Sequence, residues 1–207
     1  MYPGQFHFLT FRRDPILPVE EHHWTISSSP TEPGFVSSTI KESGDFTATI
    51  GKTKTGDTAL VYAPFGRFSY LLHSDERDFV FIAGGIGITP LMSMLRHMRD
   101  TQAGARVLLL YANRCEEDIV FREELAEIER GEHPRLKVIH VLTEAGNGWQ
   151  GEKGRLDHER LERHCRIDLD AKAFYICAPA ALTKSVILFL KNRGVKDGRI
   201  HFEYFSF

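Results

Sequence analysis

Residues 80–95, VFIAGGIGITPLMSML, begin as a buried strand and continue with two glycines at the spacing of a dinucleotide-binding turn, Gly85-x-Gly87. Such a turn uses its first glycine to bend tightly and its second to bring the backbone close to a pyrophosphate, which the next helix N-terminus attracts. Where a third glycine is usual, this chain has Pro90. Proline is favoured in the first turn of a helix, and Thr89 before it is expected to be the N-cap. The stretch predicts a strand, a phosphate-facing turn and a helix, with a glycine turn that binds nothing as the alternative.

The chain around and after this stretch alternates between strands and helices. DFVFIA at 78–83 is a continuous apolar run, as expected for a parallel strand that is buried on both faces. A helical stripe follows, made of Leu91, Met94, Leu95 and Met98. Further strands are expected at 105–112, 136–142, 173–178 and 199–205, with helices around Phe121, Leu125 and Ile128 and around Leu182, Val186, Phe189 and Leu190. This alternation predicts a doubly wound parallel sheet.

The first part of the chain differs, because its segments are short and bounded by turn residues. Four strands are expected there, at 4–11, 22–29, 34–41 and 58–64. This pattern is typical of an antiparallel all-β domain, either a sandwich or a barrel. The polar segment HSDERD at 73–78 separates it from the α/β part. We therefore expect two domains, an antiparallel β-domain at 1–74 and an α/β domain at 75–207.

The composition excludes several classes of partner. The chain has 207 residues, with 26 Lys and Arg against 28 Asp and Glu, so its formal net charge is −2. This balance gives no electrostatic reason to expect a nucleic acid or an anionic membrane as partner. No apolar run approaches the roughly 20 residues that span a bilayer, and we see no signal peptide. Cys115, Cys165 and Cys177 lie far apart, which argues against disulfides, a zinc ribbon and an iron–sulfur cluster. We expect a cytoplasmic protein without a metal site.

A series of motifs, in this chain order, resembles the ferredoxin–NADP reductase superfamily. The motifs are HHWT at 22–25, GDFT at 44–47, APFGRF at 63–68, AGGIGITP at 83–90, YANR at 111–114, CAP at 177–179 and the ending HFEYFSF at 201–207. HHWT is similar to the flavin motif of ferric reductases and NADPH oxidases. The resemblance implies a flavin-binding antiparallel β-barrel before the α/β domain, with FAD and either NADPH or NADH as cofactors. The opening MYPGQF is similar to a strand that other barrel strands normally precede, so we expect an incomplete barrel and a weaker hold on FAD.

The resemblance assigns the FAD site to the β-domain. It implies that the Thr25 hydroxyl lies near flavin N5, that Trp24 lies against the cofactor and that His22 stands where the family often has a phosphate-facing arginine. It also implies that the backbone around Ile40, with Lys41 nearby, meets the flavin pyrimidine. The pyrophosphate would meet a short helix that opens with Gly44, Asp45, Phe46 and Thr47. The residues alone leave two alternatives to flavin binding: Trp24 is a core residue of the β-domain, and residues 44–47 form an ordinary turn.

The resemblance also implies that the dinucleotide binds at the turn and helix start made of Gly85, Ile86, Gly87, Thr89 and Pro90. Asn113 and Arg114 end the next strand, and ligands bind at strand C-termini in open α/β sheets. Arg114 is suited to the 2′-phosphate of NADPH, and a surface ion pair with Glu116 or Glu117 is the alternative. Both coenzymes stay open, with NADPH slightly favoured.

The last two motifs provide candidates for positioning the nicotinamide and covering the flavin. The resemblance implies that Cys177, followed by Ala178 and Pro179, lies near the nicotinamide as a positioning residue, and a buried structural thiol is the alternative. In the ending, Phe205 and Phe207 follow Glu203, and one of the two aromatics would cover the flavin. The candidate catalytic residues are Thr25, Cys177 and Glu203.

The function that the resemblance implies is that of an FAD-dependent NAD(P)H oxidoreductase. Hydride would pass from nicotinamide C4 to flavin N5, and electrons would then leave to an external acceptor. That acceptor is left open as a haem domain, ferredoxin, flavodoxin, ferric chelate or quinone, and an upstream membrane haem domain would place the chain at the cytoplasmic face of a membrane. The alternatives are an electron-transfer subunit of a larger complex and a non-catalytic regulatory domain that binds a dinucleotide without flavin.

Overall fold

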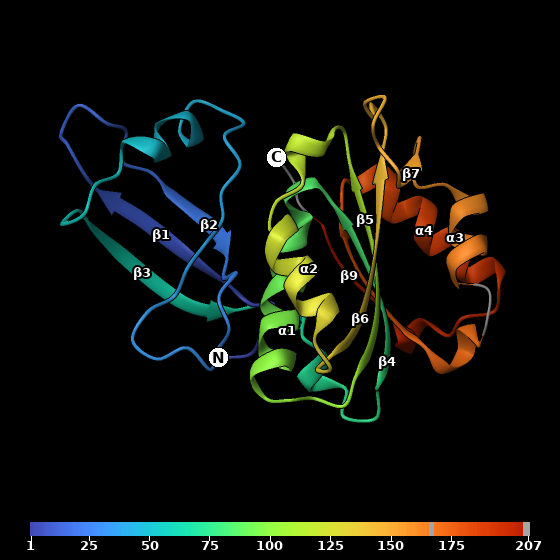
Figure 1. Cartoon of the computed structure of the whole chain (residues 1–207). Helices are drawn as coiled ribbons and strands as arrows, with labels where there is room; N and C mark the ends of the chain where they lie inside the picture. The colour runs from blue at the N-terminus through green and yellow to red at the C-terminus, as the bar shows by residue number, and fades with distance from the viewer. Residues whose placement is uncertain (166–167, 205–207) are drawn as a thin grey trace.

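The computed structural model describes residues 1–165 and 168–204, which form two sheets that lie side by side (Figure 1). The N-terminal sheet is antiparallel, with strand order β2-β1-β3. Its strands are β1 (Phe6–Arg12), β2 (Glu21–Thr25) and β3 (Thr58–Phe65). The C-terminal sheet is parallel, with order β7-β6-β5-β4-β8-β9. Its strands are β4 (Asp78–Gly84), β5 (Arg106–Asn113), β6 (Arg135–Leu142), β7 (Glu152–Lys153), β8 (Ala173–Ala178) and β9 (Ile200–Tyr204).

The N-terminal sheet departs from the expectation, because it does not close into a barrel within the described residues and the strand expected at 34–41 is not formed. Residues 34–41 are held instead by individual hydrogen bonds. The Ser27 N–H donates to the Ser37 carbonyl over 2.8 Å, and the Ser38 hydroxyl bonds the Thr25 carbonyl and the His7 ring at 2.8 Å each. These hydroxyl bonds satisfy backbone and side chain without a β-ladder. The edge strand β3 leaves all eight of its residues exposed.

The C-terminal sheet confirms the doubly wound prediction. β4 pairs in parallel with β5 on one side and with β8 on the other, so the strand order reverses beside it. Phe79 and Phe81 of β4 belong to one core cluster, and Val80 and Ile82 belong to the other, which explains the continuous apolar run. In such sheets the crevice at the carboxyl ends, next to the point of reversal, is where ligands bind.

Helices cover both faces of this sheet (Figure 1). α1 (Ile88–Asp100) and α2 (Arg122–Arg130) lie on the face towards the N-terminal sheet, and α3 (His158–Cys165) and α4 (Ala180–Asn192) lie on the other. The predicted stripe of α1 is fully buried. Short 3-10 turns complete the described structure: η1 (Thr47–Lys52), η2 (Tyr70–Leu72), η3 (Gly85–Gly87), η4 (Glu116–Asp118), η5 (Leu169–Ala171) and η6 (Asp197–Arg199).

The outer side of α1 fixes the N-terminal part of the chain against the parallel sheet. The Ser93 hydroxyl donates to the Ser28 carbonyl over 2.7 Å, and Arg96 Nη1 donates to the Ser27 carbonyl over 2.6 Å. Arg96 also makes a two-pronged ion pair with Glu124 of α2, at 2.8 and 2.6 Å. The bonds of Arg96 are partly buried and charge-assisted, and the Ser93 bond is buried, so together they hold the N-terminal part of the chain against α1.

Candidate functional site

The turn between β4 and α1 is the centre of the site. Gly87 lies against the end of β8, where a Cβ atom would come within 2.1 Å of the Cys177 carbonyl oxygen, so only glycine fits there. Pro90 is in the first turn of α1, as predicted. The prediction that Thr89 caps the helix is wrong, because α1 begins at Ile88. η3 runs directly into α1, and the Thr89 hydroxyl instead donates to the Ile86 carbonyl over 3.0 Å.

A first cavity opens at the carboxyl ends of β4, β5 and β8. Its wall brings together predicted nucleotide residues from three segments, namely Gly85, Ile86, Asn113, Arg114 and Pro179, and it also includes Lys41, which the resemblance assigns to the flavin. Asn113 is 6% exposed, and neither polar atom of its amide has a hydrogen-bond partner within the described residues. Leaving a buried amide unpaired costs about 1–3 kcal/mol. A ligand with hydrogen-bonding groups would remove that cost, so the cavity is suited to a polar molecule such as a dinucleotide.

Arg114 stands at the mouth of this cavity and is surrounded by carboxylates. Its Nε lies 3.9 Å from Glu144 Oε2 and 3.7 Å from Asp118 Oδ2, and both carboxylates raise the pKa of the guanidinium. Neither residue was among the partners considered from the sequence, and Glu116 pairs with Arg122 instead. The Cys115 thiol donates to Asp118 over 3.2 Å and so lowers the pKa of that carboxyl. The cation at the cavity mouth is therefore matched by negative charge.

A second cavity lies beside the first, between the N-terminal sheet and α1. Its wall includes every described residue that the sequence assigned to FAD: His22, Trp24, Thr25, Ile40, Lys41, Gly44, Asp45, Phe46 and Thr47. The His22 ring lies 4.2 Å from the Phe46 ring and 5.4 Å from the Trp24 ring, which gives the wall an aromatic surface. The buried Trp24 Nε1 has no hydrogen-bond partner within the described residues. An aromatic wall with a free indole donor fits a flat heteroaromatic ring such as a flavin or an adenine.

The turn at Gly44–Thr47 differs in detail from the expectation. The Thr47 hydroxyl accepts hydrogen bonds from the Ser43 and Gly44 N–H groups, at 2.8 and 2.9 Å, and donates to the Gly44 carbonyl. The hydroxyl is therefore engaged within the turn, as in an ordinary cap. For the N–H groups of Asp45 and Phe46, no hydrogen bond is found within the described part of the chain. These two groups are the donors that the turn can offer to an anion.

Cys177 and Glu203 face each other across the β8–β9 ladder, at its carboxyl end. Cys177 is fully buried, and desolvation raises the pKa of its thiol well above its usual value, so the side chain is a buried thiol without thiolate character. Burial raises the pKa of Glu203 to about 7. Its Oε1 lies 4.0 Å from the place of a Cβ on Gly66, and so points towards the N-terminal part of the chain. Phe205 and Phe207 lie outside the described residues.

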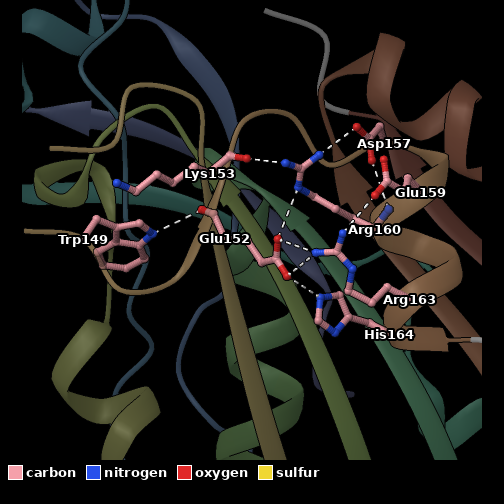
Figure 2. Close-up of polar contacts among 8 residues, drawn as sticks. All are labelled: Trp149, Glu152, Lys153, Asp157, Glu159, Arg160, Arg163 and His164. Atoms are coloured by element: carbon pink, nitrogen blue, oxygen red, sulfur yellow. Dashed lines mark hydrogen bonds and ion pairs between the residues drawn. The ribbon is translucent and has the colours of Figure 1, made fainter. Parts of the chain in front are cut away.

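Sequence reasoning did not find two polar clusters. In one, Glu152 of β7 bonds Arg163 and His164 of α3 at 3.0 and 3.1 Å, as Figure 2 shows. The Trp149 indole donates to the Glu152 carbonyl over 3.1 Å. This network joins a two-residue edge strand to a helix and balances its own charges. In the other, Glu76 receives hydrogen bonds from Tyr175 and His201. Its residues come from the segment treated as a polar hinge and from a strand 125 positions away, so no local pattern indicates the cluster.

Comparison with known proteins defines the family. The oxidoreductase NAD-binding domain model matches residues 81–187. This chain belongs to that family. Among its relatives, the NADPH nitrate reductase of Emericella nidulans is 33% identical over 171 residues, covering 77% of this chain and 20% of that protein. NADH-cytochrome b5 reductase 2 of Rattus norvegicus is 32% identical over 186 residues, covering 77% of this chain and 67% of that protein. The chain therefore spans about a fifth of the nitrate reductases that it matches.

A solved structure extends the comparison to the fold. A ferredoxin NADP+ reductase from Neisseria gonorrhoeae with bound FAD and NADP has a TM-score of 0.79 at 23% identity, covering 99% of this chain and 87% of that one. The chain thus has the two-part fold of the ferredoxin–NADP reductase and cytochrome b5 reductase superfamily, and relatives with this fold bind FAD and NAD(P). Among the described helices, none combines the length and apolarity needed to cross a lipid bilayer.

Proposed function

We propose that this chain is a reductase module that oxidises NAD(P)H with FAD and passes the electrons to an external acceptor. The observation that carries the proposal is the junction of the two cavities. Thr39, Ile40, Lys41 and Ile86 line both of them. One cavity has an aromatic wall, and the other contains the unpaired Asn113 amide. Two ligands bound in adjoining cavities would meet at this shared wall, and hydride transfer requires such contact.

In this proposal FAD occupies the cavity next to the N-terminal sheet. Trp24 and His22 pack against its rings, Thr25 lies near flavin N5, and the Asp45 and Phe46 N–H groups meet the pyrophosphate. When bound, FAD supplies the hydride acceptor at N5. The division into an FAD domain at 1–74 and an NAD(P) domain at 75–207 belongs to the same proposal, as do lids formed by Phe205 or Phe207.

The dinucleotide occupies the cavity at the carboxyl ends of β4, β5 and β8, with the turn at Gly85–Gly87 against its pyrophosphate. The buried Cys177 supports that turn through its carbonyl, so its role is to position the nicotinamide. Glu203 lies beside Cys177 with its pKa near neutrality. It is therefore able to hold or release a proton next to Cys177.

The acceptor is proposed as a haem-containing domain or protein, because relatives are named for cytochrome b5 and for nitrate reduction. The small share of the nitrate reductases that the chain covers supports its role as one module in an electron-transfer chain. Ferredoxin, flavodoxin, ferric chelates and quinones are the competing acceptors. A cytoplasmic location is part of the proposal and is tested separately by fractionation.

The proposal is tested by anaerobic visible spectra of the chain mixed with FAD, before and after addition of NADH or NADPH. We expect protein-bound oxidised flavin bands that one nucleotide bleaches. Trp24→Ala is expected to weaken FAD binding, whereas Trp149→Ala, a control in the edge network, should leave it unchanged. Bound flavin that neither nucleotide bleaches would refute the hydride-transfer function, and nucleotide binding without flavin binding would favour a regulatory domain.

A further inference from the structure

Two histidines and a buried glutamate cluster where the segment between the two sheets passes β9. His73 and Glu76 belong to that segment, and His201 lies near the start of the strand. None of the three lines either cavity described above. Each offers one ligand atom, an imidazole nitrogen or a carboxylate oxygen, and these atoms all lie within 4.8 Å of one another. We propose that His73, Glu76 and His201 form a site for one Zn²⁺ ion, with solvent as the fourth ligand.

The donor set indicates which metal would bind. Two imidazole nitrogens and one carboxylate oxygen form a set that zinc takes in sites with an open fourth position. Mg²⁺ and Ca²⁺ prefer sites made of oxygen atoms alone. The cluster therefore discriminates against the abundant hard cations by its chemistry.

Glu76 is held in place for this role. It is 3% exposed, and the Tyr175 hydroxyl donates to its Oε2 over 2.7 Å. Burial and this carboxylate together raise the pKa of Tyr175 far above its usual value, so the phenol remains a donor. The other oxygen, Oε1, lies 2.9 Å from His201 Nε2. A ligating carboxylate that is oriented by an outer hydrogen bond is a common feature of metal sites.

His73 completes the set. Its ring stacks on His201 with 4.0 Å between centroids, and no hydrogen bond from this ring is found in residues 1–165 and 168–204. Its imidazole offers one nitrogen to the cluster. Tetrahedral ligands at 2.0–2.1 Å from zinc lie about 3.4 Å apart. A pair of ligand atoms at the 4.8 Å limit would have to approach by about 1.4 Å, and the half-buried His73 ring on its loop can do this by rotating.

The charge of Arg199 opposes a metal ion at this position. Arg199 Nη1 lies 3.7 Å from Glu76 Oε1, and its Nη2 lies 2.9 Å from Asp75 Oδ2. A cation at Glu76 would compete with this guanidinium. Removing the charge of Arg199 should therefore strengthen zinc binding, whereas removing a ligand should weaken it. This opposite response separates a metal site from a simple hydrogen-bond network.

The test is a titration of the chelator-treated chain with Zn²⁺ by calorimetry, at pH 7.5 in buffer that does not bind metal. We expect one ion per chain, at least tenfold weaker binding for His73→Ala and tighter binding for Arg199→Gln. His158→Ala is the matched control, because His158 lies in α3 and contacts Ser185 outside the cluster. The zinc affinity of this variant should equal that of the unaltered chain. The absence of stoichiometric binding, or equal affinity of His73→Ala, would overturn the site.

Co²⁺ provides a second measurement that needs no variant. Cobalt in a tetrahedral site with two histidines and one carboxylate gives intense visible bands, whereas octahedral cobalt gives weak ones. Intense bands that Zn²⁺ displaces are the expected result. Weak octahedral bands would overturn the proposed coordination even if His73→Ala failed to fold.

Discussion

At the scale of single residues, Glu203 combines burial with a place beside Cys177 at the carboxyl end of the β8–β9 ladder. Its pKa of about 7 means that the folded chain binds a proton which the unfolded chain, with an ordinary pKa of 4.5, has already lost. Between these two pKa values the native state holds more protons than the unfolded state, so stability must fall as the pH rises from about 4 to about 7. The effect amounts to about 3 kcal/mol at most.

We therefore predict that the two proteins are closest in stability near pH 4 and that Glu203→Gln becomes the more stable one as the pH rises to 8. The amide resembles the protonated carboxyl and does not ionise. Denaturant unfolding at several pH values measures the difference between the two proteins, in which contributions of other groups cancel. A constant difference across this range would show that Glu203 ionises normally.

Arg114 carries the residue-scale prediction on coenzyme choice. The sequence slightly favoured NADPH, but Asp118 and Glu144 balance the arginine and would repel a 2′-phosphate. A ribose diol can donate hydrogen bonds to the same carboxylates. We predict that kcat/KM is higher with NADH than with NADPH.

The Asp118→Asn, Glu144→Gln double variant should shift the ratio of kcat/KM with NADPH to kcat/KM with NADH by about tenfold or more in favour of NADPH. A tenfold shift corresponds to about 1.4 kcal/mol of lost repulsion between the carboxylates and the 2′-phosphate. Glu159→Gln, on the exposed surface of α3, is the control and should not change the ratio. Higher kcat/KM of the unaltered chain with NADPH would refute the assignment.

At the scale of elements, the turn between β4 and α1 depends on a contact with the neighbouring strand. Gly87→Ala places a methyl group 2.1 Å from the Cys177 carbonyl, so the turn must move away from β8. We predict a loss of about 1–3 kcal/mol of stability and a large loss of dinucleotide affinity, with FAD binding retained. Gly104→Ala is the control, because no atom lies within 4 Å of its added Cβ. Denaturation and nucleotide titration measure both effects, and wild-type affinity of Gly87→Ala would contradict the proposed role of the turn.

Elements with a strong internal pattern were predictable, and those fixed by distant contacts were not. The stripe of α1 and the apolar run of β4 are both buried as their spacing indicated. Thr89 was assigned as a cap because sequence does not show that η3 continues into α1. The segment at 34–41 has strand-like residues, but serine hydroxyls bind it to Thr25 and His7 in place of a ladder.

At the scale of the whole molecule, Arg96 links the two sheets through the Ser27 carbonyl and Glu124. We predict that Arg96→Leu separates the unfolding of the two parts, because it removes charge-assisted bonds worth about 1.5–3 kcal/mol each. Trp24 reports on the N-terminal sheet and Trp149 on the other, so single-tryptophan variants can follow each part by fluorescence. Arg106→Leu, which removes an exposed ion pair with Asp78, is the control. A single coincident transition in Arg96→Leu would contradict the prediction.

At the candidate site, the sequence motifs indicate residues that the fold brings together, but they do not indicate the charges around them. All nine described residues assigned to FAD line one cavity, because the motifs carry those positions along the chain. The carboxylates around Arg114 come from η4 and from the segment after β6, and the Glu76 cluster joins residues from three separate segments. The charge balance around Arg114 and the Glu76 cluster both depend on packing between segments that are far apart in the sequence, and the motifs do not indicate such packing.

The packing of the three cysteines has a practical consequence for spectroscopy. Cys165 and Cys177 are buried, whereas Cys115 is partly exposed and lies next to Arg114 at the cavity mouth. A maleimide dye should therefore attach to a single thiol in the native chain, without prior mutagenesis. Because the Asp118 hydrogen bond raises the pKa of this thiol, labelling should be faster at mildly alkaline pH. The attached fluorophore would then report the arrival of a coenzyme directly, in a stopped-flow instrument or on single molecules.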